Sequence, residues 1–233
     1  MMTFLITIIT YIVYRLAKFL YSQRQLPFFH PLLLAPAMLI GIISIVHISA
    51  SEYIGDAKWL SHMLAPATVA FAVPIYKHRQ LVLKYISTIL ASITAGSLIA
   101  IFSSYVLAEA INLKYDFVTS ILPRSITTPI AIEVSKETGG LPTLTTVFVI
   151  MTGVVGGIVG PMVIKWLSIK NPIAKGLALG MGAHGAGTNK AMEYGEQEAT
   201  FSSIGMIFAA VITFASGILL IPLLMHLGQL FSL

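Results

Sequence analysis

Cysteine is absent from the 233 residues, and charged residues make up only 10% of them. Without cysteine the chain forms no disulfide and no thiolate metal site, and it has no thiol nucleophile. The net charge of +5 comes from basic residues between the hydrophobic runs, with no basic and aromatic stripe of the kind that binds nucleic acid. Apolar side chains dominate instead, with 57% of the residues and a mean hydropathy of +0.89. A soluble core of this size cannot hide that much apolar surface, so the sequence predicts an integral membrane protein.

Seven apolar runs are long enough to cross a bilayer, which takes about 20 such residues. The first lies within residues 1–25 and has no cleavage-site pattern, so we expect a retained first helix with its amino end outside. The other six are residues 31–50, 59–76, 82–108, 141–167, 173–192 and 201–228. The sequence therefore predicts an all-α, multi-pass protein with one transmembrane domain over residues 1–233.

The charges in the connections indicate a topology. Basic residues gather in 15–24, 77–84 and 165–175, whereas residues 193–198 are acidic. Basic loops of membrane proteins are cytoplasmic. All three basic connections share one side only if residues 119–140 enter and leave the membrane on the same face, as a re-entrant hairpin. The acidic connection is then expected outside.

A comparison of the chain with itself indicates a repeat. Residues 57–60 (AKWL) align with residues 174–177 (AKGL), and the basic connection 77–84 falls opposite the acidic connection 193–198. Matched elements of opposite charge predict an inverted-topology repeat, with halves 1–116 and 117–233. In secondary transporters such repeats place the substrate at their interface, on broken helices near mid-membrane.

Two polar stretches interrupt the apolar chain, at residues 122–140 and 180–188. Each combines proline or glycine with hydroxyls and a basic side chain, and lipid accepts such backbone only where protein or a water-filled cavity satisfies it. In the repeat alignment, Pro66 and Thr68 of the first half fall opposite the glycine-rich stretch of the second. Two broken helices are therefore expected to meet, with free N–H groups suited to a carboxylate.

In the first polar stretch, Arg124 is a candidate clamp for an anionic group, because a guanidinium grips a carboxylate with two bonds. The alternative is an arginine that snorkels to the interface. Ser125, Thr127 and Thr128 are candidate hydroxyl contacts, or they bond back to helical carbonyls. Glu133 pairs with Arg124 or Lys136, or it carries a coupling proton.

In the second stretch, His184 is a candidate substrate contact or proton carrier, or it makes a bond between helices. Gly185 and Gly187 permit the unwound backbone of the site, and Thr188 adds a hydroxyl. Lys190 is either a second anion contact or the counter-ion of a nearby glutamate. The glycine pairs between 153 and 160 predict close helix packing without a ligand.

No zinc-protease, nucleotide-binding or hydrolase motif occurs in the chain, and its six histidines lack ligand spacing. We therefore expect neither an enzyme nor a metal or other cofactor.

The polar motifs resemble the LrgB/CidB family over nearly the whole chain. The resemblance is carried by PRSITTPIA (123–131), KNPIAKG (170–176), AHGAGT (183–188) and LAPATVA (64–70) with PIY (74–76). It implies a bacterial inner-membrane (plasma-membrane) protein related to a chloroplast glycolate/glycerate carrier. It also implies a small separate membrane partner of LrgA/CidA type.

From the residues and this resemblance we predict a carrier of small 2-hydroxy or 2-oxo monocarboxylates that works by alternating access. Glycolate, glycerate, lactate and pyruvate are substrates of this kind. The alternative is a holin/antiholin-like protein that regulates lysis and murein hydrolase activity with the LrgA/CidA-type partner. A homo-oligomer is left open by the sequence.

Overall fold

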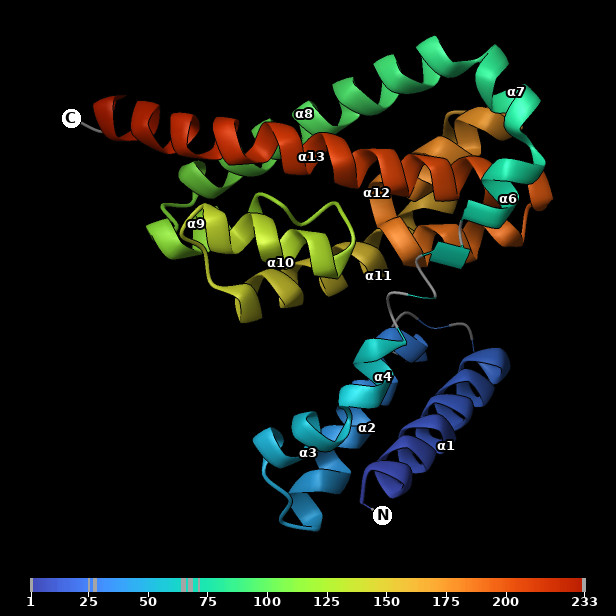
Figure 1. The fold of residues 1–233 in the computed structure, drawn as a ribbon, viewed down its shortest axis with the longest axis vertical. Coiled ribbons are helices and arrows are strands. Elements are labelled where there is room, and N and C mark those ends of the chain that lie inside the picture. Colours follow the sequence, from blue (N-terminus) through green and yellow to red (C-terminus); the bar gives the residue numbers. More distant parts are fainter. Residues whose placement is uncertain are drawn as a thin grey trace. The chain divides into compact units, whose positions relative to one another are not determined.

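The computed structural model describes residues 2–24, 26, 29–63, 66, 69–70 and 72–231. In these residues the regular structure is helical, as the sequence predicts. The chain divides into two compact units, Met1–Val73 and Pro74–Leu233. Figure 1 shows the helices of each unit.

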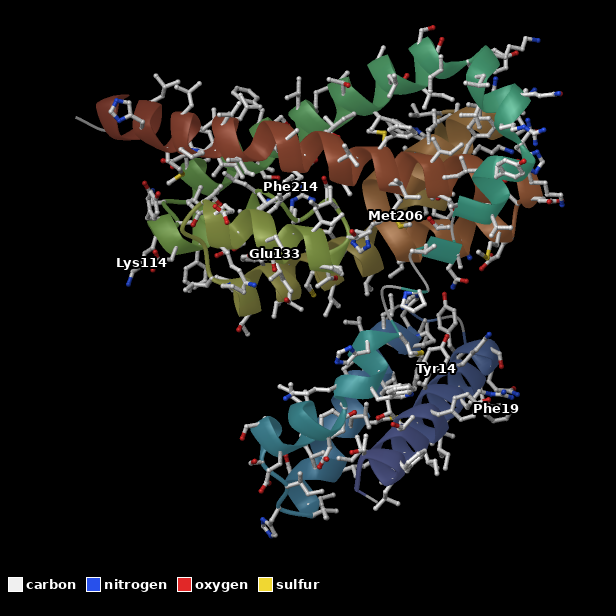
Figure 2. All side chains as sticks on the ribbon, in the orientation of Figure 1. Tyr14, Phe19, Lys114, Glu133, Met206 and Phe214 are labelled. Atoms are coloured by element: carbon white, nitrogen blue, oxygen red, sulfur yellow. The ribbon has the colours of Figure 1, made fainter. Side chains whose placement is uncertain are left out.

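The N-terminal unit is a small helical cluster. Its helices are α1 (Met2–Gln23), α2 (Pro31–Ile45), α3 (Ala50–Asp56) and α4 (Lys58–His62). Helix α1 packs on α2 through Val13, Ala17 and Ala35. The axis bends by 117° between α2 and α3, where Ser49 and Glu52 form a capping box at the new helix start. Phe19 extends outward from α1 with 59% of its surface exposed, as expected for a helix surrounded by lipid (Figure 2).

The C-terminal unit is built on three long helices, α8 (Ile86–Ala110), α11 (Pro142–Trp166) and α13 (Glu196–Phe231). Helix α6 (Ala72–Lys77) includes the boundary between the two units. The other shorter elements are α7 (Arg79–Lys84), α9 (Tyr115–Ile121), α10 (Thr128–Glu137) and α12 (Pro172–Met192). On α8 the buried side chains recur every three or four residues from Ile89 to Ala108, which places them on one face of the helix. Leu122, Val134, Phe201 and Ile221 belong to the same core.

Residues 120–141 form a first hairpin, which contains the break between α9 and α10. Its ends lie together, because the Leu141 N–H donates to Ser120 Oγ at 2.8 Å. Thr145, in the first turn of α11, closes the base by donating to the Ser120 carbonyl at 3.0 Å. These contacts agree with the predicted hairpin over residues 119–140.

Residues 175–194 form a second hairpin, although α12 runs through most of it. The helix breaks at His184, whose φ of 39° and ψ of −120° are not helical. A methyl group added at Gly187 would overlap the Leu179 carbonyl, and a straight helix would hold these two residues about 12 Å apart. Lys175 Nζ lies 5.2 Å from the centre of the Tyr194 ring. The chain therefore reverses at His184.

The two hairpins approach α11 from opposite ends. The base of the first contacts Thr145 near the start of α11, whereas Leu179 and Ala191 of the second pack on Ile164 near its end. Both turns reach the same middle stretch of α11. There Arg124 contacts Thr152, and the His184 ring contacts the next residue, Gly153.

The glycines of α11 make the close approach to the second hairpin possible. A Cβ at Gly156 would lie 2.7 Å from the Ala183 Cβ, and one at Gly160 would lie 2.7 Å from the Leu179 side chain. The predicted packing role of the glycine pairs is confirmed by these contacts.

Four helices are long and apolar enough to span a membrane: Thr3–Gln23, Ile86–Ala110, Pro142–Trp166 and Glu196–Gly228. The bent pair of α2 and α3 makes a fifth span if it crosses as one. The expectation of seven spans is not confirmed. The run 173–192 is not a span, because it reverses at His184. The run 59–76 lies partly outside the described residues.

The inverted repeat with halves 1–116 and 117–233 is also not confirmed. Its matched connections were expected on opposite sides, yet Lys77 forms an ion pair with Glu196. Lys175 lies 3.9 Å from Glu198 at the same end of α13. The physical reason is the reversal of α12, which returns the acidic connection to the side from which α12 started.

A different internal arrangement is present in the C-terminal unit. Helix α8 is followed by the first hairpin, and α11, which is also 25 residues long, is followed by the second. Because the hairpins enter from opposite ends of α11, the two helix-plus-hairpin segments run in opposite senses.

We predict that single cysteines at Gln80, Ser168 and Gln197 label from one side of the membrane, and that a cysteine at Lys114 labels from the other. Gln80 in α7 and Gln197 in the first turn of α13 lie near the ion pair of Lys77 and Glu196, and Ser168 lies between α11 and α12. Helix α8 separates this end of the unit from Lys114. The basic residues there predict the cytoplasmic side. The measurement is labelling with an impermeant thiol reagent in intact cells and in inverted vesicles. Labelling of Gln197 from the side of Lys114 would contradict the second hairpin.

Candidate functional site

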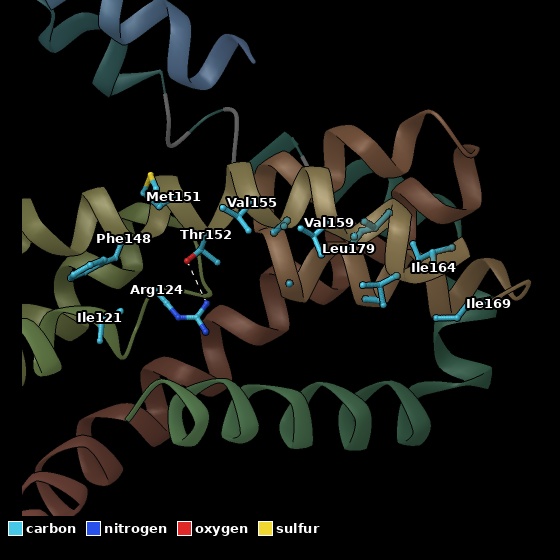
Figure 3. A pocket seen from close by; sticks show the side chains of 16 residues that line it. Ile121, Arg124, Phe148, Met151, Thr152, Val155, Val159, Ile164, Ile169 and Leu179 are labelled. Carbon is cyan, nitrogen blue, oxygen red and sulfur yellow. Dashed lines mark hydrogen bonds between the residues drawn. The ribbon is translucent and has the colours of Figure 1, made fainter. Parts of the chain in front are cut away.

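The turn of the first hairpin carries Arg124. Helix α9 ends at Ile121, and α10 begins at Thr128 with Pro129 in its first turn, where the missing N–H breaks no helical bond. Between them, Leu122 and Ile126 are buried in the core and hold the turn in place. Arg124 is thereby fixed within the bundle at the level of Thr152 on α11 (Figure 3).

The Arg124 guanidinium bonds only to neutral groups in the described part of the chain. Its Nε donates to Ser104 Oγ at 3.0 Å, and its Nη1 donates to Thr152 Oγ1 at 3.4 Å. None of the ion pairs among the described residues includes Arg124. A charge inside a membrane protein is costly when unpaired, so this cation favours a bound anion.

Two cavities meet at Arg124. The α11 cavity, of about 480 Å³, lies between α11 and the first arm of α12 and is largely apolar, with Phe148, Val155 and Leu179 in its wall (Figure 3). The α8 cavity, of about 310 Å³, includes Ser97 and Ser125. Both volumes fall in the usual range for small-molecule sites. Arg124, Ala178 and Gly182 line both cavities.

His184 forms the turn of the second hairpin. Its Nε2 lies 3.0 Å from the Val149 carbonyl of α11, to which it donates, and its ring packs against Gly153. Of the interpretations from sequence, this contact matches the bond between helices. A φ of 39° is rare for a residue with a side chain and costs about 1–3 kcal/mol.

The other predicted site residues are spread over several environments. Ser125 is buried and lines the α8 cavity. Thr188 is buried against Ser202, to whose hydroxyl it is hydrogen-bonded at 3.0 Å. Thr127 and Thr128, at the start of α10, belong to neither cavity wall.

The two glycines after His184 differ sharply. Gly185 has open space around it, whereas Gly187 is pressed against the Leu179 backbone. Of the residues predicted in the first half, Pro66 is exposed in the N-terminal unit, and Thr68 lies outside the described residues.

The charged residues near the site are paired with each other. Glu133 forms an ion pair with Lys136 at 2.8 Å on the exposed face of α10, so its pairing with a lysine is confirmed. Lys190 pairs with Glu193 at 2.6 Å, which confirms the counter-ion interpretation for this residue. No group of three or more metal-binding side chains occurs in the parts of the chain that the structure describes.

Ser97, Ser104 and Thr152 contribute to the site but were not predicted from sequence. Ser97 and Ser104 lie on the buried face of α8, one heptad apart, where the neighbouring buried residues are Ile93, Ile101 and Ala108. A hydroxyl in such an apolar stripe is the signal that was missed, because each serine alone has the appearance of an ordinary helix residue. Thr152 has no comparable signal.

Together these features define an all-helical membrane protein with two opposed hairpins and a partly buried arginine that lines two cavities. The chain belongs to the LrgB-like family, whose model matches residues 10–227.

Two bacterial relatives align with most of this chain. The uncharacterized protein YwbG of Bacillus subtilis (strain 168) is 43% identical over 205 residues, which are 88% of this chain and 91% of the relative. The holin-like protein CidB of Staphylococcus aureus (strain N315) is 37% identical over 209 residues, or 90% of this chain and 91% of the relative. No solved structure matches the chain.

We predict that Gly187→Ala destabilises the protein by about 1–3 kcal/mol, because the new methyl group would overlap the Leu179 carbonyl. Gly185→Ala is the matched control and should change the stability by less than about 1 kcal/mol, since no atom lies within 4 Å of its Cβ position. The measurement is thermal unfolding in detergent. Equal melting temperatures for the two variants would contradict the reversal of α12.

We also predict that His184→Gly is more stable than His184→Ala by about 1 kcal/mol or more. Both variants lose the bond to Val149, but only glycine relieves the backbone strain at a φ of 39°. This order is the reverse of ordinary helix interiors, where alanine is better by about 1 kcal/mol. Thermal unfolding of the two variants measures the difference. A more stable alanine variant would place His184 in regular helix.

Proposed function

We propose that this protein is an inner-membrane carrier of small organic anions, with monocarboxylates bearing a 2-hydroxy or 2-oxo group as the substrate class. The observation that carries this proposal is the position of Arg124, which has no carboxylate partner among the described residues and lines two cavities. A bound carboxylate would neutralise the guanidinium and accept two parallel bonds from it. Two helix breaks in one membrane unit are common where transporters bind their substrates.

In this proposal Arg124 is the anion clamp, and Ser125 is a hydroxyl contact within the α8 cavity. His184, Gly187 and Thr188 hold the second hairpin in shape around the cavities. Proton coupling through His184 or Glu133 stays a prediction, which the loss of pH-driven uptake in His184→Gln would support.

A holin-like function is the second candidate, and the names of the relatives favour it more directly than they favour a carrier. CidB of S. aureus is called a holin-like protein, and the alignment with it covers 90% of this chain. In this alternative the chain assembles with a small LrgA/CidA-type membrane protein and regulates lysis and murein hydrolase activity.

Reconstitution of the purified protein in liposomes separates the two candidates. A carrier should take up radiolabelled lactate or pyruvate with saturation and stereoselectivity, while an entrapped fluorescent dye stays inside. A holin-like pore should release the dye and discriminate little between solutes. Dye release without saturable uptake, with or without the partner protein, would contradict the carrier.

We predict that Arg124→Lys weakens substrate binding roughly tenfold to a hundredfold. Lysine keeps the positive charge but cannot make the two parallel hydrogen bonds that a guanidinium makes to a carboxylate. The loss of a charge-assisted contact costs about 1.5–3 kcal/mol of binding free energy. Arg79→Lys is the matched control, since Arg79 lies on the surface, 4.7 Å from the Tyr76 ring, and should bind as the parent protein does. Binding is measured by competition in the uptake assay. Near-normal affinity in both Arg124→Lys and Arg124→Ala would remove Arg124 from the site.

A further inference from the structure

The α8 cavity contains a buried hydroxyl without a hydrogen-bond partner. Ser97 is only 2% exposed, and its Oγ bonds to no other group in the part of the chain that the structure describes. Most serines in helices donate to a carbonyl of the preceding turn, as Ser104 does to Ala100 at 2.6 Å. Ser97 does not, although it lies on the same buried face of the same helix.

An unpaired hydroxyl in such a place costs free energy, and a ligand in the cavity would remove that cost. The cavity that Ser97 lines is also lined by Arg124 and Ser125. Ser97, Ser125 and Arg124 therefore belong to the wall of one cavity. The α11 cavity has no second unpaired hydroxyl of this kind among its described lining residues.

Arg124 and Ser97 would bind different atoms of the ligand, because they differ in the number of their hydrogen-bond donors. The guanidinium fork can satisfy both oxygens of a carboxylate by itself. The Ser97 hydroxyl is then left for the next polar atom of the ligand, which in a 2-hydroxy or 2-oxo acid is the oxygen on the adjacent carbon. A hydroxyl suits both classes, because it can donate to an oxo group and can either donate to or accept from a hydroxyl group.

We propose that Ser97 is a specificity-determining residue, which binds the oxygen on the carbon next to the carboxylate and so selects 2-oxo and 2-hydroxy acids over unsubstituted acids. This proposal rests on the proposed function, because it requires a carboxylate at Arg124.

The experiment compares two acids that differ at one carbon, pyruvate and propionate. Their dissociation constants are measured by calorimetry for the parent protein and for Ser97→Ala. The parent protein should bind pyruvate more tightly. In Ser97→Ala the affinity for pyruvate should fall about threefold to tenfold, the usual worth of one neutral hydrogen bond, and the affinity for propionate should stay constant.

Two further variants control for indirect effects. Ser103→Ala removes a hydroxyl from the same helix that bonds to the Ala100 carbonyl at 3.3 Å and lines neither cavity, so both affinities should stay as in the parent protein. Ser97→Thr keeps the hydroxyl and should keep the preference for pyruvate. Because Ser97 Oγ has no partner, Ser97→Ala should also unfold at a temperature no lower than that of the parent protein.

The outcomes separate this proposal from the one it rests on. An equal loss of pyruvate and propionate binding in Ser97→Ala would assign Ser97 to the carboxylate and overturn its role in selection. Unchanged pyruvate binding in that variant would overturn any role for Ser97. A parent protein that binds neither acid would instead overturn the carboxylate site itself.

Discussion

The need to satisfy backbone hydrogen bonds in a lipid environment governs the C-terminal unit. A helix that breaks in mid-membrane exposes N–H and C=O groups, which only protein or enclosed water can satisfy. Both breaks in this unit lie against long helices: Arg124 is held by α8 and α11, and His184 by α11. The broken elements are therefore stable only as part of the bundle, and the long helices decide where the breaks lie.

The first arm of α12, from Pro172 to His184, is about 18 Å long, which is little more than half of a hydrocarbon core of about 30 Å. An arm of this length is too short to cross the layer, and the turns of the two hairpins meet at the middle of α11. Glycine permits the approach, because a Cβ at Gly176 would lie 2.5 Å from the Glu198 carbonyl of α13. The small residues of α11 and α12 thus serve the hairpin geometry, and the turn of the first hairpin places Arg124 in the walls of both cavities.

The sequence was sufficient for the membrane class, the long helices and the first hairpin, because these depend on local hydropathy and on loop charges. It was misleading for residues 173–192, where an apolar run with five interspersed glycines has the composition of a span. The reversal depends on the φ of a single histidine, and no composition rule contains that information. Arg124 was predicted as a site residue because an arginine beside prolines is conspicuous in an apolar chain. The hydrogen-bond partners of Arg124, Ser104 and Thr152, were not predicted. They lie 20 and 28 residues away in the sequence, on other helices, and only the packed structure shows these contacts.

The two cavities share three lining residues, Arg124, Ala178 and Gly182. This sharing affects how an anion would cross the hydrocarbon layer of the membrane. The main barrier to moving a small anion through hydrocarbon is the loss of its hydration shell. An anion that exchanges one cavity for the other stays within reach of the same positive charge, so it never stands alone in the apolar layer.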